Sequence, residues 1–75
     1  MDKIGIYTDS AGEFLIIETP SEIQFELSDA ARKLLVTGNK LQQPYVRINI
    51  KNLLPGNYLL KINYEGLTLY QRISI

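Results

Sequence analysis

The chain has 75 residues with 8 Lys and Arg, 8 Asp and Glu, and no His or Cys, so its formal net charge at pH 7 is zero. This length fits a single domain over residues 1–75, and the missing His and Cys exclude a Ser-His-Asp triad, a cysteine nucleophile, a disulfide and an imidazole or thiolate metal site. The basic residues are dispersed, with only Arg32 and Lys33 adjacent, which argues against a nucleic-acid partner.

The first half of the chain alternates between apolar runs and turn residues. Ile4–Tyr7 is the first candidate strand, and Phe14–Ile17 is a continuous apolar run of the kind expected for a strand that is covered on both faces. Ile23, Phe25 and Leu27 alternate with polar residues. This period of two predicts a strand with one buried and one solvated face.

The next segment can be interpreted in two ways. Ser28–Leu35 looks locally like the start of a helix with a capping serine, but a helix of about two turns is marginal by itself. We therefore predict a turn over Asp29–Arg32 followed by a strand over Lys33–Val36, with the short helix as the alternative. Thr37–Lys40 contains glycine and asparagine and is predicted to be a second turn.

The second half of the chain repeats the period of two. Val46, Ile48 and Ile50 define one strand, Tyr58–Tyr64 a second and Leu67–Ile75 the last. Six or seven short strands separated by turns are typical of an antiparallel sandwich or barrel, and we predict an all-β antiparallel sandwich of about seven short strands. The predicted core consists of Phe14, Ile16, Ile23, Phe25, Leu35, Val46, Ile48, Leu60 and Ile62.

The polar residues do not form a pattern typical of catalysis. Glu18, Glu22 and Glu26 are expected at outward-facing strand positions, as solvated side chains and not as a catalytic carboxylate pair. Asp9–Glu13 offers oxygen ligands, but its spacing does not match a calcium-binding loop, so Asp9 is expected to bond to the backbone of its own turn. We predict no enzyme activity, no catalytic residue, no metal site and no cofactor.

The five tyrosines could form a carbohydrate- or peptide-binding platform if they were exposed. Tyr58 and Tyr64 are in register with the apolar residues of their strand, which places them in the core or at its rim. Tyr45 and Tyr70 have no such constraint. Packing into the core is the favoured interpretation for the set as a whole.

Three segments resemble a known family. Leu54–Ile62, with its Leu-Pro-Gly-Asn-Tyr start, and the hairpin that runs through Glu65-Gly66 to Ile75 are similar to the type A C-terminal sorting domains of the Bacteroidetes type IX secretion system. Ile23–Leu35 resembles the strand, turn and strand upstream in those domains, and Ile6–Ile16 lies where they begin. The resemblance implies an immunoglobulin-like sandwich with a role in recognition.

Two non-catalytic functions follow as expectations. The chain is a sorting or surface-attachment domain bound by secretion machinery, or a free-standing structural or adhesive subunit of a surface or viral assembly. The expected partner-binding segment is the last strand, because an edge strand can pair with another chain, including a second copy of this one. Its residues are Tyr70, Gln71, Arg72, Ile73, Ser74 and Ile75. The alternative is that Ile73 and Ile75 only close the core.

The sequence contains no stretch of ~20 apolar residues, so we predict no membrane insertion. Its first residues also lack the basic segment and apolar run of a secretory signal. If the chain is a fragment of a longer precursor, we expect it to be secreted or held at the cell surface. If the chain is complete, its compartment stays open.

Overall fold

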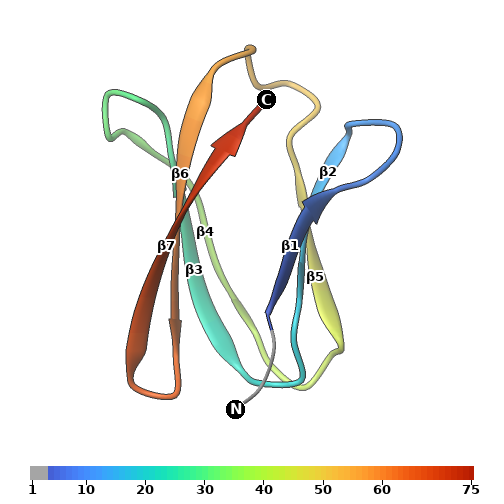
Figure 1. Cartoon of the computed structure of the whole chain (residues 1–75), viewed down its shortest axis with the longest axis vertical. Helices are drawn as coiled ribbons and strands as arrows, with labels where there is room; N and C mark the ends of the chain where they lie inside the picture. Colours follow the sequence, from blue (N-terminus) through green and yellow to red (C-terminus); the bar gives the residue numbers. More distant parts are fainter. Residues whose placement is uncertain (1–3) are drawn as a thin grey trace.

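The computed structural model describes residues 4–75 and contains two antiparallel sheets of short strands (Figure 1). The strands are β1 (Gly5–Thr8), β2 (Phe14–Glu18), β3 (Ile23–Ser28), β4 (Leu34–Lys40), β5 (Tyr45–Asn49), β6 (Asn57–Tyr64) and β7 (Leu67–Ser74). One sheet has the order β1-β2-β5 and the other the order β4-β3-β6-β7. The described residues form no helix. The prediction of an all-β sandwich of about seven strands is confirmed.

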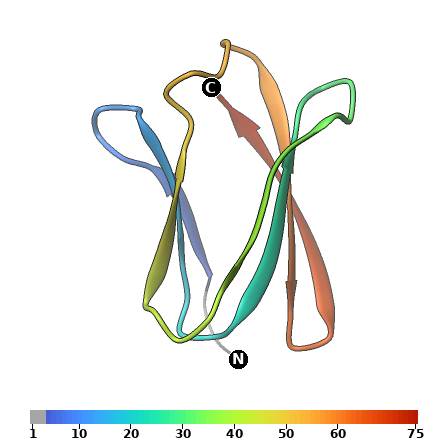
Figure 2. The same cartoon turned by 180° about the vertical axis from the view of Figure 1, so that it is seen from behind.

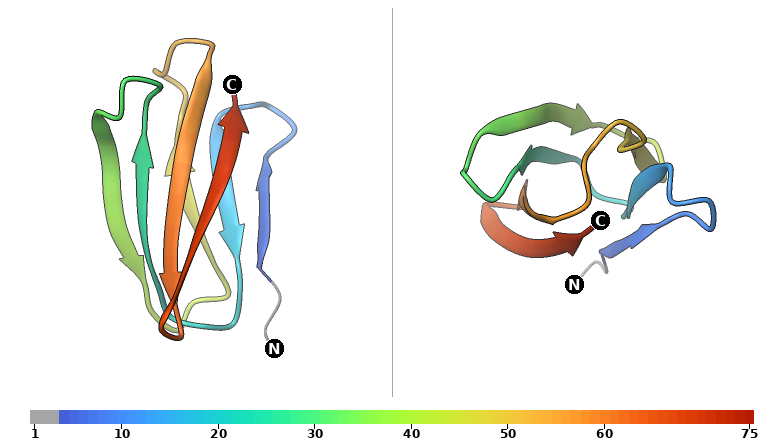
Figure 3. Two further views of the ribbon diagram at one scale, coloured as in Figure 1. Left: turned by 60° about the vertical axis from the view of Figure 1, so that its left-hand side comes forward. Right: turned by 90° about the horizontal axis from the view of Figure 1, so that it is seen from above.

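The two sheets pack face to face in a body of 33 × 26 × 17 Å (Figure 1). The edge strands β1 and β7 lie on one side of the sandwich, and β4 and β5 lie on the opposite side, which Figure 2 brings forward. The view from above in Figure 3 shows the two layers separately. In immunoglobulin constant domains the fourth strand belongs to the first sheet; here it pairs with β3 in the second sheet.

A tyrosine at the start of β6 supports the immunoglobulin-like classification. The hydroxyl of Tyr58 donates a hydrogen bond to the backbone carbonyl of Leu54, four residues upstream. This is the arrangement called a tyrosine corner in immunoglobulin-like sandwiches. The ring itself is buried, so Tyr58 and the equally buried Tyr64 belong to the core, as predicted.

The core face of β2 differs from the prediction. Leu15 and Ile17 are buried, whereas Phe14 and Ile16 lie on the outer face and are only partly buried. The register explains this result, because Leu15 pairs with Ile48 of β5 and paired residues of an antiparallel sheet point to the same side. A continuous apolar run gives no indication of which alternate residues point inward.

The other predicted core positions are confirmed with two qualifications. Ile23, Phe25, Ile48, Leu60 and Ile62 are all buried. Leu35 and Val46 are partly buried and pack against the core. The core also includes Leu15, Ile17, Leu27, Ile50 and Ile73, which were not in the predicted set, together with the two tyrosines that were predicted in the core or at its rim, Tyr58 and Tyr64.

The connection between β3 and β4 is a turn, as predicted, and not a helix. One carboxylate oxygen of Asp29 accepts hydrogen bonds from the backbone N–H groups of Ala31 and Lys33, both at 2.9 Å. Arg32 has a φ of 67°, in the left-handed region that residues with a side chain seldom adopt. The side chain of Asp29 therefore accepts the hydrogen bonds of backbone N–H groups that carbonyl oxygens would accept in a helix.

The prediction of a turn over Thr37–Lys40 is wrong, because these residues form the second half of β4. Gly38 is opposite Phe25 in the register, and a Cβ at this glycine would lie 2.8 Å from the Phe25 ring. The glycine is thus a packing residue that makes room for an aromatic ring.

The actual turn to β5 follows Lys40, whose side chain is 2% exposed. Its ammonium donates to the carbonyls of Leu41 at 3.1 Å and Gln43 at 2.7 Å.

Candidate functional site

The surface with the clearest capacity for binding is the free edge of β7. This strand pairs with β6 on one side only. Ile75, just beyond the end of β7, exchanges two backbone hydrogen bonds with Gly56, at 2.8 and 2.9 Å. In an antiparallel pair, alternate residues direct both backbone groups to the partner strand. Because the backbone N–H and C=O groups of Ile75 are directed to Gly56, those of the other odd-numbered residues are directed to β6. The backbone N–H and C=O groups of the even-numbered residues are directed away from β6, to the free edge.

The free edge therefore presents the backbone N–H and C=O groups of Thr68, Tyr70, Arg72 and Ser74. The carbonyl of Arg72 accepts a hydrogen bond at 3.2 Å from the side-chain amide of the neighbouring Gln71, which is exposed. This bond shows that a donor can reach the outward carbonyl. The row of backbone groups can pair with an added strand in the same way.

The three other edge strands offer shorter or less regular templates. The pairing of β3 with β4 shifts between Leu27 and Ser28, so that Leu35 is an extra residue in β4. Such a bulge twists an edge and interrupts its hydrogen-bonding row. β1 has 4 residues and β5 has 5, against 8 in β7, which pairs with β6 without a register shift. Among the described strands, β7 is the longest regular edge.

The side chains of β7 divide the strand into two halves. On the inward side, Ile73 is 7% exposed and Ile75 packs against the core, whereas Leu67 and Leu69 are 50% and 39% exposed. Figure 1 shows the reason, since the end of β7 approaches the other sheet while its start, at the hairpin with β6, lies far from that sheet. The opposite sheet thus leaves the leucines half uncovered. On the outer side, Tyr70 is 62% exposed.

The structure places the predicted segment on this edge but gives its residues different environments. Tyr70, Gln71, Arg72 and Ser74 are exposed, whereas Ile73 and Ile75 belong to the core or pack on it. Ile73 and Ile75 therefore close the core, whereas partner binding by the exposed residues of the segment stays a prediction. Leu67 and Leu69, in the first part of the predicted last strand, extend this edge to the hairpin with β6. Their alternation with polar residues is the signal in the sequence that identifies them.

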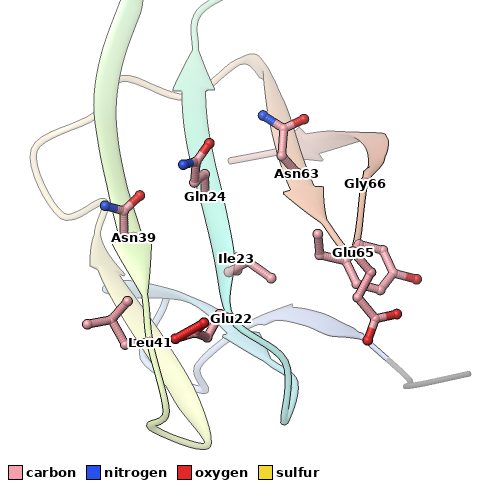
Figure 4. A pocket seen from close by; sticks show the side chains of 9 residues that line it. Glu22, Ile23, Gln24, Asn39, Leu41, Asn63, Glu65 and Gly66 are labelled. Carbon is pink, nitrogen blue, oxygen red and sulfur yellow. The ribbon is translucent and has the colours of Figure 1, made fainter.

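A shallow pocket on the outer face of the four-stranded sheet, beside the hairpin between β6 and β7, has amide side chains along its wall (Figure 4). Its volume is about 360 Å³. Gln24 on β3 is in register with Asn39 on β4 and with Asn63 on β6, and Figure 4 shows the three side chains along neighbouring strands. These amide groups can donate and accept hydrogen bonds.

The outer face of the three-stranded sheet carries aromatic side chains at positions where a strand with one buried face usually has polar residues. Phe14 lies under the guanidinium of Arg47, 4.8 Å from the ring centre, and the hydroxyl of Tyr7 donates to a carboxylate oxygen of Glu18 at 3.3 Å. Partial desolvation and the nearby Glu18 charge raise the pKa of Tyr7 above its usual value of 10.0. Tyr45, on the same face, is also exposed. Packing into the core, the interpretation favoured for the tyrosines as a set, is therefore wrong for Tyr7, Tyr45 and Tyr70, whose strand faces are turned away from the core or are not covered by the opposite sheet. The apolar run at residues 14–17 was the sequence signal for this face.

Within residues 4–75, no three Asp or Glu side chains come together in a group that could hold a metal ion. Asp9 accepts the backbone N–H groups of Glu13 and Phe14 at 2.8 and 3.1 Å, as expected of a turn residue. No helix in this part of the chain has the length and apolar character needed to cross a membrane. The prediction that the chain is not an enzyme remains a prediction.

Comparisons with known proteins add no relative. No protein-family model matches this chain, and a search of curated proteins finds no match. The resemblance to the sorting domains of the type IX secretion system therefore stays a prediction from the sequence.

Proposed function

We propose that this chain is a non-catalytic recognition module that binds a protein partner by accepting an extended segment of that partner beside β7. The observation that supports this function is the free edge of 8 residues, with outward backbone groups at Thr68, Tyr70, Arg72 and Ser74. An added strand would satisfy these groups and place its alternate side chains against the strand's two faces.

The half-exposed leucines define the chemistry of the bound segment. A strand added to β7 places every second side chain beside Leu67 and Leu69, on the inward face, where apolar residues gain most by leaving water. Arg72 is the only charged residue of β7. An extended partner segment with alternating apolar residues and no basic residue opposite Arg72 therefore fits this edge best.

The resemblance to C-terminal sorting domains supports a cellular role for the same edge. In that role the secretion machinery binds β7, a cargo domain lies on the same precursor, and the module is secreted or attached to the cell surface. The alternative is a structural or adhesive subunit of a surface or viral assembly, in which neighbouring subunits use the edge. Both roles need a protein partner and no cofactor.

The experiment must block the edge without removing Ile73 and Ile75, because these residues pack in or on the core. Tyr70→Pro meets this condition, since the Tyr70 N–H points to the free edge and is not used in the ladder with β6. Tyr70→Thr is the matched control, because it removes the ring but keeps the N–H and a strand-forming residue. Each variant is fused to a reporter and expressed in a bacterium with a type IX secretion system.

We expect export of the reporter with the intact module and with Tyr70→Thr, and loss of export with Tyr70→Pro. Amide hydrogen exchange of the purified domains checks that the proline variant keeps the β6 ladder. Equal export of the folded proline variant and the intact module would refute binding through the edge. If the intact module exports no more reporter than a fusion without it, the sorting role is wrong.

A further inference from the structure

The residues of β7 and Ile75 follow nearly the same chemical pattern in both directions from Gln71. Its two neighbours are Tyr70 and Arg72, an aromatic ring and a guanidinium, and the next pair is Leu69 and Ile73, both aliphatic. The pair after that is Thr68 and Ser74, both hydroxyl residues, and the last is Leu67 and Ile75, again both aliphatic. A two-fold axis at Gln71 would therefore place chemically matched residues opposite one another.

We infer that the edge of β7 binds a second copy of this chain by two-fold antiparallel pairing centred on Gln71. This inference rests on the proposed function, since it names the occupant of the same edge. Because the even-numbered residues point outward, Tyr70 of one copy and Arg72 of the other would exchange both backbone hydrogen bonds. Thr68 and Ser74 would do the same, so the pairing adds about eight backbone hydrogen bonds across the two-fold axis.

Side chains on the outer face distinguish this register from its neighbours. With the axis at Gln71, each Arg72 guanidinium lies across from the exposed Tyr70 ring of the other copy, a favourable cation–aromatic pair. With the axis moved to Arg72, the two guanidinium groups face each other and repel. With the axis moved to Tyr70, the two Tyr70 rings face each other and Leu67 still faces Ile73. Leu69 then faces Gln71 and Arg72 faces Thr68, so the Arg72–Tyr70 pairs are lost and only half of the aliphatic pairs remain.

Side chains on the inward face favour the same register. Leu69 lies opposite Ile73 of the second copy, and Leu67 lies opposite its Ile75. The two leucines are 39% and 50% exposed in the single chain, and the pairing covers them with the aliphatic residues that close the neighbouring core. The zero net charge of the chain means that no overall repulsion opposes the approach of two copies.

The extent of the contact indicates a reversible dimer. The paired residues, Leu67–Ile75, span about 27 Å along the strands, but only one strand of each copy is involved. This places the interface in the small class of transient contacts. A dimer of this kind occupies the edge that a different partner would need. Other partners of β7 then compete with the second copy.

Cysteine cross-linking tests both the pairing and its register. The chain has no Cys, so any disulfide must come from an introduced residue. In the proposed register the two Gln71 residues form a pair without backbone hydrogen bonds, with Cα atoms about 4.5 Å apart, which suits a disulfide. The matched control is Leu69→Cys on the same strand and face. Its two copies would be about 14 Å apart, too far for a bond.

Under mild oxidation we expect the Gln71→Cys chain to form at least five times more disulfide dimer than the Leu69→Cys chain. Adding Tyr70→Pro to Gln71→Cys should reduce the dimer to the control level, because the proline removes an outward N–H. Circular dichroism checks that all variants fold. Equal cross-linking of Gln71→Cys and Leu69→Cys, or cross-linking that resists Tyr70→Pro, would overturn the inference.

The two proposals fail in different ways. If cross-linking of Gln71→Cys stays at the control level while Tyr70→Pro still abolishes export, self-pairing is wrong and the edge binds a different strand. If cross-linking occurs as expected while Tyr70→Pro leaves export unchanged, self-pairing is supported and the proposed sorting function through β7 is wrong.

Discussion

The contact between Gly38 and Phe25 gives a prediction with a defined magnitude. A Cβ at Gly38 would lie 2.8, 3.0 and 3.3 Å from three atoms of the Phe25 ring. The ring is 6% exposed and surrounded by the core, so it cannot move away without disturbing its neighbours. Overpacking of this kind costs about 1–3 kcal/mol. Replacing glycine by alanine in a strand returns about 0.5–1 kcal/mol through the lower entropy of the unfolded chain.

We therefore expect Gly38→Ala to lower the free energy of unfolding by about 1 kcal/mol, which corresponds to a fall in Tm of about 4–8 °C for a domain of this size. The assay is thermal and urea unfolding followed by circular dichroism. Gly5→Ala is the matched control, because its Cβ would meet only ordinary contacts, the nearest at 3.7 Å from the Cβ of Glu18. That variant should leave Tm unchanged or raise it slightly.

A double-mutant cycle identifies the cause. Phe25→Leu shortens the side chain above Gly38, so the combination of Phe25→Leu and Gly38→Ala should cost about 1 kcal/mol less than the sum of the two single changes. If Gly38→Ala is neutral or stabilising, the close contact is not a constraint on this site. If the two changes are additive, the loss comes from some other neighbour than the ring.

Three further predictions concern single residues. Arg32→Gly should raise the free energy of unfolding by about 0.5–1 kcal/mol, because the φ of Arg32 is 67° and glycine adopts this angle without strain. Ala31→Gly should lower the free energy of unfolding. Urea titration of both variants checks this prediction, and equal effects would refute it. Lys40→Ala should lower the free energy of unfolding by about 2–4 kcal/mol. Lys40→Met should lower it less, because methionine keeps the buried aliphatic part of the side chain while both variants lose the two hydrogen bonds to carbonyls. Equal urea unfolding curves for the two variants would show that the aliphatic part contributes nothing. The raised pKa of Tyr7 means that the folded state holds the phenol proton more tightly, so this group stabilises the fold below pH 10 and loses that contribution as the pH rises through its folded pKa. Spectrophotometric titration should find a lower pKa for Tyr7 in Glu18→Gln than in the unchanged chain. An unchanged pKa would contradict the role of Glu18.

Much of the candidate site could be predicted from the sequence. The alternation over Leu67–Ile75 identified a strand, and the sheet order β4-β3-β6-β7 places that strand at an edge. The division of that strand into a covered half and an uncovered half could not be predicted. It depends on how far the three-stranded sheet extends opposite β7, and this extent follows from the packing of strands that are distant in sequence.

The sequence by itself determined the strand period, the number of strands and the absence of His and Cys chemistry, because these properties are local or compositional. Only the tertiary structure decided which face of β2 is buried, since all of Phe14–Ile17 are apolar and the register with β5 selects Leu15 and Ile17. It also decided that Gly38 lies within a strand, because the reason for the glycine is the Phe25 ring across the sheet. Local patterns determine where strands form, whereas contacts between distant segments determine which side of each strand meets the core or the solvent.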